Sequence, residues 1–342
     1  MWVRNGLQIK GQAMTYIQCN FCNSMVDADL YLLQICATEL PPELFLNTVF
    51  EKFHVMDMLS LAPYAANSFL ESEHDMPMLE SCLTFLASLM DIRTNIGMPD
   101  APLSQLEMVT LLCMGAKTHS QLIELMPEKC GTSQSRDFES ALAEVADYHE
   151  PNLEASGNMQ QGMYLPKPKV WEEMYDPIHV SLRAVHRRDY QASMDKFTSL
   201  ACSSGLFRGN GSPWPPFRLP GPVNPSYKDP QCLLCSRFFH AIAFVILYKA
   251  VNGQSVSEYI IALTLYLLEM AVSFTKPTEN KEGQICQAST SQEPEDRRDL
   301  EFSNWYESDW LSSNLRTVIN KVTLNPERRL SFDSSEGSEN SE

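Results

Sequence analysis

The sequence predicts a mainly α-helical protein. Among 342 residues there are 14 glycines and 17 methionines, and runs that alternate Val, Ile or Thr with polar residues are few. Unbranched apolar residues favour helices, whereas β-branched alternation favours strands. Hydrophobic residues make up 44% of the chain, which is enough to build a core. We therefore expect a helical scaffold with an embedded winged-helix domain and a disordered acidic C-terminal tail.

Residues 1–100 are predicted to form the helical scaffold. Apolar residues at helical spacing indicate helices over residues 7–17, 29–40, 43–53 and 76–91. Asp27 precedes the second of these and is a suitable N-cap. Pro42 can open the third, because its missing N–H would be unpaired in the first turn anyway. The charged stretch 91–100, which ends in Pro99 and Asp100, marks the boundary.

Residues 101–171 are predicted to form the winged helix. A first helix is followed by a break at Gly115, and a second starts at Thr118 or Ser120. A third, around Phe138, ends before Pro151, and a short strand covers residues 162–166. Helix, turn, helix, helix and strand in this order are typical of a winged helix. The apolar face of the first helix consists of Leu106, Val109, Leu112 and Cys113.

The charge of the chain argues against nucleic acid as a partner. The formal net charge is −17, whereas binding to a phosphate backbone requires a basic surface. The third helix of the winged helix, which would be the recognition helix, is itself acidic. A DNA-binding regulator is therefore disfavoured, and a protein-binding winged helix is favoured. The acidic residues in question are Asp137, Glu139, Glu144, Asp147 and Glu150.

A basic helix is predicted after the winged helix, within residues 172–201. Residues 179–199 indicate an exposed helix that carries Arg183, Arg187, Arg188 and Lys196. This helix could dock an acidic neighbour within the chain, or it could present a solvated face. We favour the solvated face, since exposed ion pairs contribute little to stability.

Residues 202–230 are too rich in Pro and Gly for a long helix or a central strand. We expect a linker that packs in part through Trp214, Phe217 and Tyr227 and holds its flanking units at a set separation. Residues 231–275 then form a helical hairpin that turns at Asn252-Gly253. Its first apolar run is too short to cross a membrane, and Glu258 and Glu269 interrupt its second, so no membrane span is expected.

The last part of the chain is predicted to be mostly polar. Residues 276–299 are low in apolar content and should be disordered. Residues 300–325 indicate one more amphipathic helix, and residues 326–342 form an acidic, Ser-rich tail. Within that tail, Arg328-Arg329-Leu330-Ser331 matches a basophilic kinase target. Phosphorylation of Ser331 is a hypothesis that intact-mass measurement of protein from cells would test.

The sequence offers no catalytic, cofactor-binding or metal-binding residues that we would assign. Two Cys-x-x-Cys pairs occur, but zinc needs four ligands and they are far apart. The first pair could recruit His54 or His74, yet no third cysteine lies near. His119 is expected at a helix start or on the surface, and His240 in a core. A nucleophile elbow and a P-loop are absent from the sequence. The two pairs are Cys19 with Cys22 and Cys232 with Cys235.

Several phrases of the sequence resemble the UBR-type E3 ubiquitin ligases of the N-degron pathway, most closely the third, divergent member of that family. The resemblance covers roughly residues 1–325, although residues 150–161 look longer than the family's usual wing. It implies a long helical scaffold with an embedded winged helix. The matching phrases are Met1-Trp2-Val3-Arg4-Asn5-Gly6-Leu7, Pro42-Glu43-Leu44-Phe45-Leu46, Ala116-Lys117-Thr118-His119-Ser120-Gln121-Leu122, Gly162-Met163-Tyr164-Leu165-Pro166-Lys167-Pro168 and Trp214-Pro215-Pro216-Phe217.

The resemblance implies a function that belongs to a larger protein. Members of the family recognise substrates through a zinc-containing UBR box and bind the E2 enzyme through a basic helix and a zinc-containing RING. The spaced Cys and His ligands of these modules do not occur in this sequence, so we expect a central, non-catalytic scaffold fragment. Its partners would be an E2 and degradation substrates, met through the whole ligase in the cytoplasm, where the cysteines stay reduced. A free-standing protein-binding winged-helix adaptor is the alternative.

Overall fold

A computed structural model describes residues 6–17, 22, 25–59, 69–127, 136–151, 161–205, 213–252 and 256–275. Four expectations lie outside these ranges: the disordered segment 276–299, the amphipathic helix 300–325, the acidic tail, and Ser331 within it. Most of the stretch 150–161 lies outside them too, as do Cys19 and Gly253.

The described chain is built from helices and one short hairpin of strands. Before the winged helix come α1 (Gly6–Ile17), α2 (Val26–Glu39), α3 (Pro42–Lys52), the 3₁₀ helix η2 (Asp57–Leu59) and α4 (Phe69–Asp91). Next follow α5 (Asp100–Cys113), α6 (His119–Leu125), α7 (Arg136–Val145), β1 (Ala146–His149) and β2 (Met163–Pro166). The remaining elements are α8 (Pro168–Glu173), α9 (Pro177–Arg183), α10 (Arg187–Ser203), the 3₁₀ helix η4 (Pro230–Cys235), α11 (Arg237–Val251) and α12 (Glu258–Thr275). A mainly α-helical fold is confirmed.

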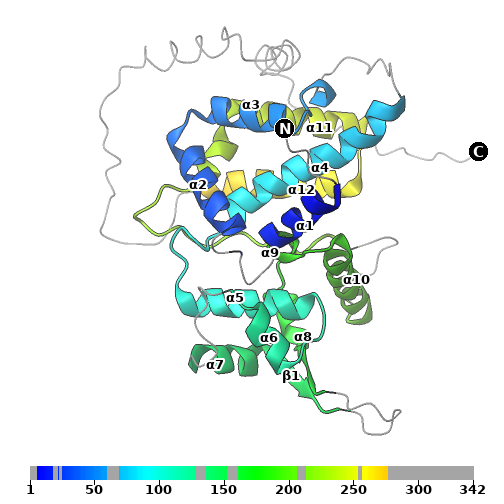
Figure 1. Ribbon diagram of the computed structural model, residues 1–342. Coiled ribbons are helices and arrows are strands. Elements are labelled where there is room, and N and C mark those ends of the chain that lie inside the picture. The colour runs from blue at the N-terminus through cyan, green and yellow to red at the C-terminus, as the bar shows by residue number, and fades with distance from the viewer. Residues whose placement is uncertain are drawn as a thin grey trace, which may run out of the picture.

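A first hydrophobic core joins two parts of the sequence that lie far apart. Helices α2, α3 and α4 pack with η4, α11 and α12, and we call this group the helical unit (Figure 1). The 3₁₀ helix η4 lies among five helices of the unit, α2, α3, α4, α11 and α12. Leu233 and Leu234 on this turn are fully buried. The core therefore closes only when residues near 235 meet residues near 40 and 85.

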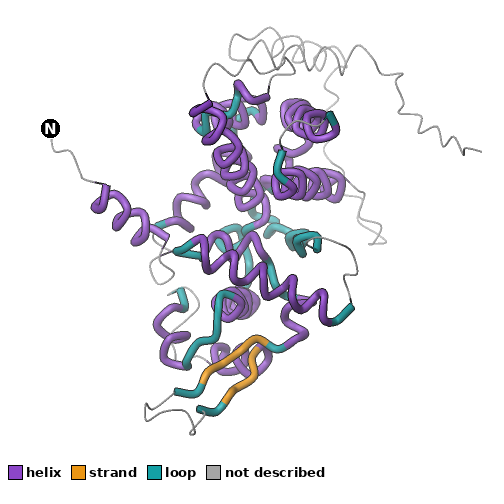
Figure 2. Tube along the Cα trace, turned by 90° about the vertical axis from the view of Figure 1, so that its right-hand side faces the viewer, coloured by secondary structure: helices purple, strands orange, loops and turns teal. Residues whose placement is uncertain are grey.

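A second hydrophobic core belongs to the winged-helix unit, which we define as α5 to α10 with β1 and β2. The strands pair antiparallel, with Ala146 opposite Pro166, and lie at the end of the molecule remote from the helical unit (Figures 1 and 2). An isolated antiparallel bridge also joins Lys117 to Tyr164 of β2. The hydroxyl of Thr118 accepts a hydrogen bond from the backbone N–H of Gln121, whose side chain bonds back to Thr118. This capping box fixes the start of α6 where the sequence indicated it.

The third helix of the winged helix is shorter than the sequence predicted. It ends at Val145, and the carbonyl of Val145 accepts a hydrogen bond from Lys167 N at 3.0 Å, next to the β1–β2 ladder. Pairing with β2 overrides the helical pattern of residues 146–149, so Asp147 and Glu150 do not belong to the helix. The ring centroids of Tyr148 and Tyr164, which lie opposite each other on the two strands, are 5.2 Å apart.

Two details of the helical unit also correct the sequence expectations. Asp27 is not an N-cap: Met25 precedes α2 without a side-chain cap, and Asp27 lies buried in the first turn of the helix. Helix α4 begins earlier than expected, at Phe69, and contains Pro77. The opening of α3 by Pro42 is confirmed.

An extended segment, residues 213–229, runs between the two units, and we call it the proline strap. Phe217 stacks on Tyr266 of α12 at 4.6 Å, and the backbone N–H of Asn224 bonds to the carbonyl of Ile96 at 3.2 Å. Gly97, with φ +109°, lies so close to Asn224 that an added Cβ would collide with it. Of the expected anchors, Phe217 and Tyr227 contact other rings, while Trp214 is 53% exposed.

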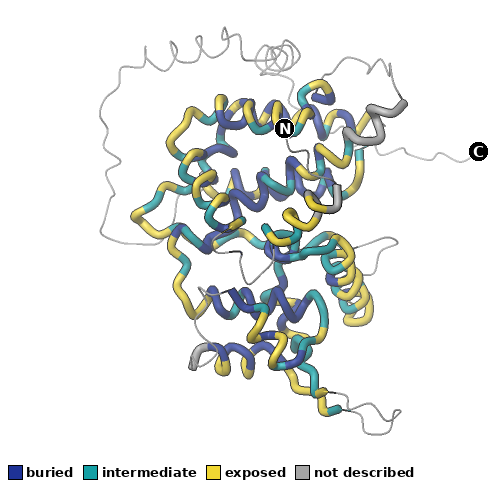
Figure 3. Tube along the Cα trace, in the orientation of Figure 1, coloured by how far each residue is buried: buried dark blue, intermediate teal, exposed yellow. Residues whose placement is uncertain are grey.

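The helices of each unit have buried inner faces and exposed outer faces. Buried positions line the contacts within each unit, whereas the outer faces of α10 and α11 carry many exposed positions (Figure 3). His240 lies on the exposed face of α11, so its expected place in a core is wrong. In the part of the chain that the structure describes, no helix is long and apolar enough to span a bilayer.

Candidate functional site

A buried ionic contact joins the two units, beside the apolar packing of Ile178 of α9 in the first core. The guanidinium of Arg183, in the last turn of α9, donates to Asp27 of α2 at 2.7 and 3.0 Å and to Glu107 of α5 at 2.6 to 3.1 Å. The imidazole Nε2 of His179 lies 3.1 Å from a carboxylate oxygen of Glu107. All four side chains are about 1% exposed. We call Asp27, Glu107, His179 and Arg183 the ionic junction, because it joins the helical unit to the winged-helix unit.

Local sequence explains how these side chains converge. Asp27 lies in the first turn of α2 and Arg183 in the last turn of α9, the ends of a helix where the backbone dipole favours a negative and a positive charge respectively. The carboxylate of Asp176 caps α9 by accepting from the backbone N–H groups of Ile178 and His179. That cap sets the start of α9 and hence which face carries His179 and Arg183.

Charge compensation governs the titration of the ionic junction. Burial by itself would raise the pKa of Glu107, but Arg183 and then His179 outweigh it and hold that pKa well below its usual value. Burial would lower the pKa of Arg183, but Glu107 and Asp27 raise it well above its ordinary value. A buried ion pair of this kind adds little net stability, yet removal of one partner strands an unpaired charge. The arrangement therefore fixes the relative position of the two units.

Polar contacts of the proline strap reinforce this geometry. Arg93, after α4, donates to the strap carbonyl of Gly221 at 3.0 Å and pairs with Asp229 at 3.4 Å. Arg218 of the strap donates to the carbonyls of Tyr175 and Glu172 in the winged-helix unit, at 2.7 and 2.8 Å. The strap is thus tied to both units at once.

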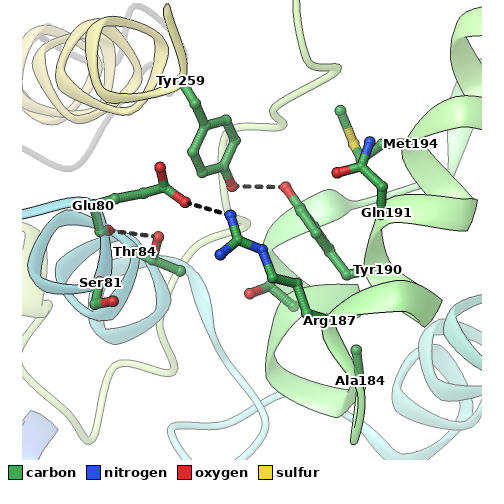
Figure 4. Close-up of a pocket in the computed structure, with 10 residues that line it drawn as sticks. Glu80, Ser81, Thr84, Ala184, Arg187, Tyr190, Gln191, Met194 and Tyr259 are labelled. Carbon is green, nitrogen blue, oxygen red and sulfur yellow. Dashed lines mark hydrogen bonds and ion pairs between the residues drawn. The ribbon is translucent and has the colours of Figure 1, made fainter. Parts of the chain in front are cut away.

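Beside the ionic junction, an open cleft of about 570 Å³ lies between α4 and α12 on one side and α9 and α10 on the other. Two contacts cross it (Figure 4). The hydroxyls of Tyr190 and Tyr259 bond at 2.7 Å, and Arg187 lies 3.6 Å from Glu80. The Arg187 side chain is 86% exposed, so its ion pair with Glu80 is a weak one.

The basic helix expected over residues 179–199 is wrong in two respects. The structure has two helices there, α9 and α10, because α9 ends at Arg183 and α10 begins at Arg187. Arg183 is buried rather than exposed. Arg187 and Arg188 are strongly exposed, but each lies beside a carboxylate, of Glu80 and Asp189 respectively.

Histidine and cysteine candidates stay dispersed in the structure. His119 begins α6 and pairs with Glu139 at 2.9 Å on the surface, in line with its expected place. Cys232 and Cys235 are half-buried on η4, and Cys22 is buried. Among the described residues, no three His, Cys, Asp or Glu side chains are grouped so that they could hold a metal ion. The seven described cysteines are free thiols.

Sequence reasoning missed the members of the ionic junction. Asp27 was interpreted as a cap, Arg183 as a surface residue, and Glu107 was not singled out. One signal was available: Glu107 stands inside the run Leu106-Glu107-Met108-Val109, where a charge faces a core and needs a partner. Nothing local in the sequence names that partner.

Comparison with known proteins extends the picture. Residues 1–85 match the family description "UBR1/2/3-like ARM repeat domain", and residues 104–202 match "E3 ubiquitin-protein ligase UBR1-like, winged-helix domain". The human E3 ubiquitin-protein ligase UBR3 is 44% identical over 330 residues, 95% of this chain. The Ubr3 of Drosophila melanogaster is 44% identical over 338 residues, 94% of this chain. The chain belongs to the UBR family.

Members of the UBR family are much longer than this chain. This chain spans 17% of the length of the human relative and 15% of the length of the fly relative. A more distant match is the E3 ubiquitin-protein ligase PRT6 of Arabidopsis thaliana, 24% identical over 291 residues, or 84% of this chain and 13% of the plant protein. The winged-helix match extends through α8, α9 and most of α10, whose side chains pack on the second core.

Proposed function

We propose that this chain is a non-catalytic scaffold of a RING-type E3 ubiquitin ligase of the N-degron pathway type. The whole ligase would promote ubiquitin transfer from an E2 to substrates destined for proteasomal degradation, in the cytoplasm. The named relatives are E3 ubiquitin ligases that align over nearly the whole chain. The observation that carries the scaffold role is the ionic junction, in which the buried Arg183 of the winged-helix unit, itself paired with Glu107, bonds to the buried Asp27 of the helical unit.

Zinc does not fit the described residues of this chain. The family implies zinc in a UBR box and a RING, but the described side chains form no group of three ligands. We propose that other segments of the whole protein hold the zinc. The contribution of this chain is then positional: it would set the distance and orientation between the modules that read substrates and those that engage E2.

A chimera with the human relative tests the scaffold role. The segment of human UBR3 that aligns with this chain is replaced by residues 1–342, and autoubiquitination is measured with purified E1 and E2. We expect the chimera to retain activity and deletion of the segment to abolish it. In the chimera, Arg183→Leu should reduce activity, whereas Arg187→Leu on the surface should leave it unchanged. Full activity after deletion of the segment would refute a scaffold role.

The isolated chain supplies the complementary test. Mixed with an E2 that carries thioester-linked ubiquitin, it should leave the discharge rate at that of E2 alone. Accelerated discharge would contradict the non-catalytic assignment. The alternative function, a free-standing winged-helix adaptor, predicts that the chimera would be inactive even though the chain itself is folded.

A further inference from the structure

A buried carboxyl group at the end of α4 faces the winged-helix unit. Asp91 is the last residue of α4 and is only 7% exposed. It lines a cavity of about 290 Å³ where the two units and the proline strap meet, and so does Asp176, the N-cap of α9. The two carboxyl groups lie within hydrogen-bonding range of each other. Because an ionised carboxylate only accepts hydrogen bonds, such a contact requires a proton on one of them.

The contacts around Asp91 need more than one proton. The hydroxyl of Tyr266 on α12 lies 3.0 Å from a carboxyl oxygen of Asp91 and 2.5 Å from the carbonyl oxygen of Arg218. A hydroxyl has a single proton to donate. Three contacts thus run in a chain from Asp176 through Asp91 and Tyr266 to the carbonyl, and the hydroxyl proton alone cannot fill them. A second proton on the carboxyl pair fills the contact between Asp91 and Asp176.

The positions of the two carboxyl groups on their helices determine which of them holds this proton. Asp91 is at the C-terminal end of α4, where the backbone dipole disfavours a negative charge. Asp176 accepts hydrogen bonds from the backbone N–H groups of Ile178 at 2.8 Å and His179 at 3.3 Å, and such donors stabilise a negative charge. The proton therefore belongs mainly to Asp91, and the negative charge to Asp176.

The two arginines at this cavity use their guanidinium groups elsewhere. Arg93 pairs with Asp229 at 3.4 Å and donates to a carbonyl of the strap. Arg218 donates to two backbone carbonyls of the winged-helix unit. The pair of carboxyl groups is thus neutralised in part by a proton rather than by a bound cation. The remaining ionisable residues that line the cavity are Glu173 and His179.

The titration of Asp91 agrees with this arrangement. Burial, and then the charge of Asp176, raise the pKa of Asp91 well above its ordinary value. The contact with Tyr266 and the charge of Arg93 oppose this shift without cancelling it.

We propose that Asp91 and Asp176 share one proton at neutral pH and that this proton helps to join the helical unit to the winged-helix unit. Its release would leave two negative charges facing each other across the contact. In the unfolded chain an aspartic acid ionises near pH 4, about its ordinary pKa, whereas the folded chain keeps the proton to higher pH. The stability that the proton contributes is therefore complete below about pH 4 and is lost as pH rises toward the pKa of the folded chain.

Unfolding of the full 342-residue chain at different pH values tests the proposal. Urea unfolding is followed by circular dichroism for the parent chain and for Asp91→Asn, whose side chain is neutral at every pH. The parent should lose stability relative to this variant as pH rises above about 4. The ratio of the two unfolding constants should change by up to about tenfold per pH unit, because the parent alone takes up this proton on folding. A ratio that does not depend on pH would overturn the proposal.

Asp176→Asn tests whether the proton is shared. Asparagine caps helices about as well as aspartate, so α9 should keep its start. Without the charge of Asp176, Asp91 should ionise more easily, and the pH dependence should be smaller than in the parent. An unchanged pH dependence would assign the proton to Asp91 alone and overturn the sharing. Asp195→Asn, at an exposed position on α10, is the matched control and should behave as the parent does.

Infrared spectroscopy of the folded parent gives a reading that does not depend on unfolding or on any variant. A protonated carboxyl group has a carbonyl stretch that is separate from the bands of carboxylates and shifts in D₂O. We expect this band in the parent at neutral pH and its loss in Asp91→Asn. Absence of the band from the parent would overturn the proposal. None of these outcomes depends on ubiquitin ligase activity, so the proposal can fail while the scaffold role stands.

Discussion

Arg183 donates hydrogen bonds to carboxylates that lie 156 and 76 residues away along the chain. Replacement of Arg183 by a neutral residue would leave Asp27 and Glu107 buried without the guanidinium that neutralises both. Removal of one partner from a buried ion pair is costly for that reason. A single side chain thus makes the buried ionic contact between the two units.

We predict that Arg183→Leu lowers the free energy of unfolding by about 3–5 kcal/mol, the usual loss for a broken buried pair. Arg187→Leu, which removes a strongly exposed arginine at the start of α10, should change it by no more than about 0.5 kcal/mol. Urea unfolding followed by circular dichroism measures both. Equal losses for the two variants would contradict the account of the ionic junction.

The pH dependence of stability should carry the signature of Glu107. Its pKa is lower in the folded chain than in the unfolded chain, so the unfolded state binds more protons in acid. The stabilisation is fully present above the unfolded pKa of about 4.3 and is lost as pH falls below it. The urea midpoint should therefore drop between pH 5 and pH 3, and Glu107→Gln should reduce that drop. An unchanged pH profile in Glu107→Gln would show that Glu107 does not titrate as described.

At the scale of the element, capping and proline patterns in the sequence predicted the starts of several helices correctly. Thr118 at the start of α6 and Pro42 at the start of α3 act through backbone groups within three residues, and such rules can be applied to sequence alone. The end of α7 was missed because β1 pairs with β2, a contact between residues 14 to 20 positions apart that overrides local helical propensity. The burial of Arg183 was missed because its partners are distant carboxylates.

The cap of α6 gives a prediction at the same scale. Thr118→Ala removes the side-chain half of the capping box and should destabilise the chain by about 1 kcal/mol. Ser120→Ala, at an exposed position in the first turn of α6, is the matched control and should be nearly neutral. Thermal unfolding of the two variants side by side provides the measurement. A larger loss for Ser120→Ala than for Thr118→Ala would rule out the capping role.

At the scale of the whole molecule, the sequence predicted the fold class and the winged helix but not the way in which the parts meet. Hydrophobic periodicity reports which face of a helix is buried, not which other helix covers it. The contact of η4 with α2 and α3, and that of Arg183 with Asp27, join residues more than 150 positions apart. The function was inferred from the family resemblance, because the composition and the residue spacing of the sequence did not identify a catalytic site.

The charge of the whole chain yields one further prediction. Helix α7 exposes Glu139 and Glu144, and the net charge is −17, so duplex DNA should be repelled. In an electrophoretic mobility shift assay at low ionic strength we expect no shifted band. A shift that weakens as salt is added would demonstrate phosphate binding and would contradict a purely protein-binding winged helix.

The return of the chain through the proline strap makes the helical unit discontinuous, with the winged-helix unit inserted between its halves. During synthesis, α2, α3 and the second half of α4 emerge long before η4, α11 and α12, which supply the rest of their core. At translation rates of about 5–20 residues per second, the wait is on the order of 10 s. Throughout that interval the nascent chain exposes the apolar faces of α2, α3 and α4, while the winged-helix unit already has all the residues it needs to fold. Nascent chains arrested near residue 205 should therefore recruit hydrophobic-binding chaperones through residues 26–92, and release them once residue 275 has left the exit tunnel.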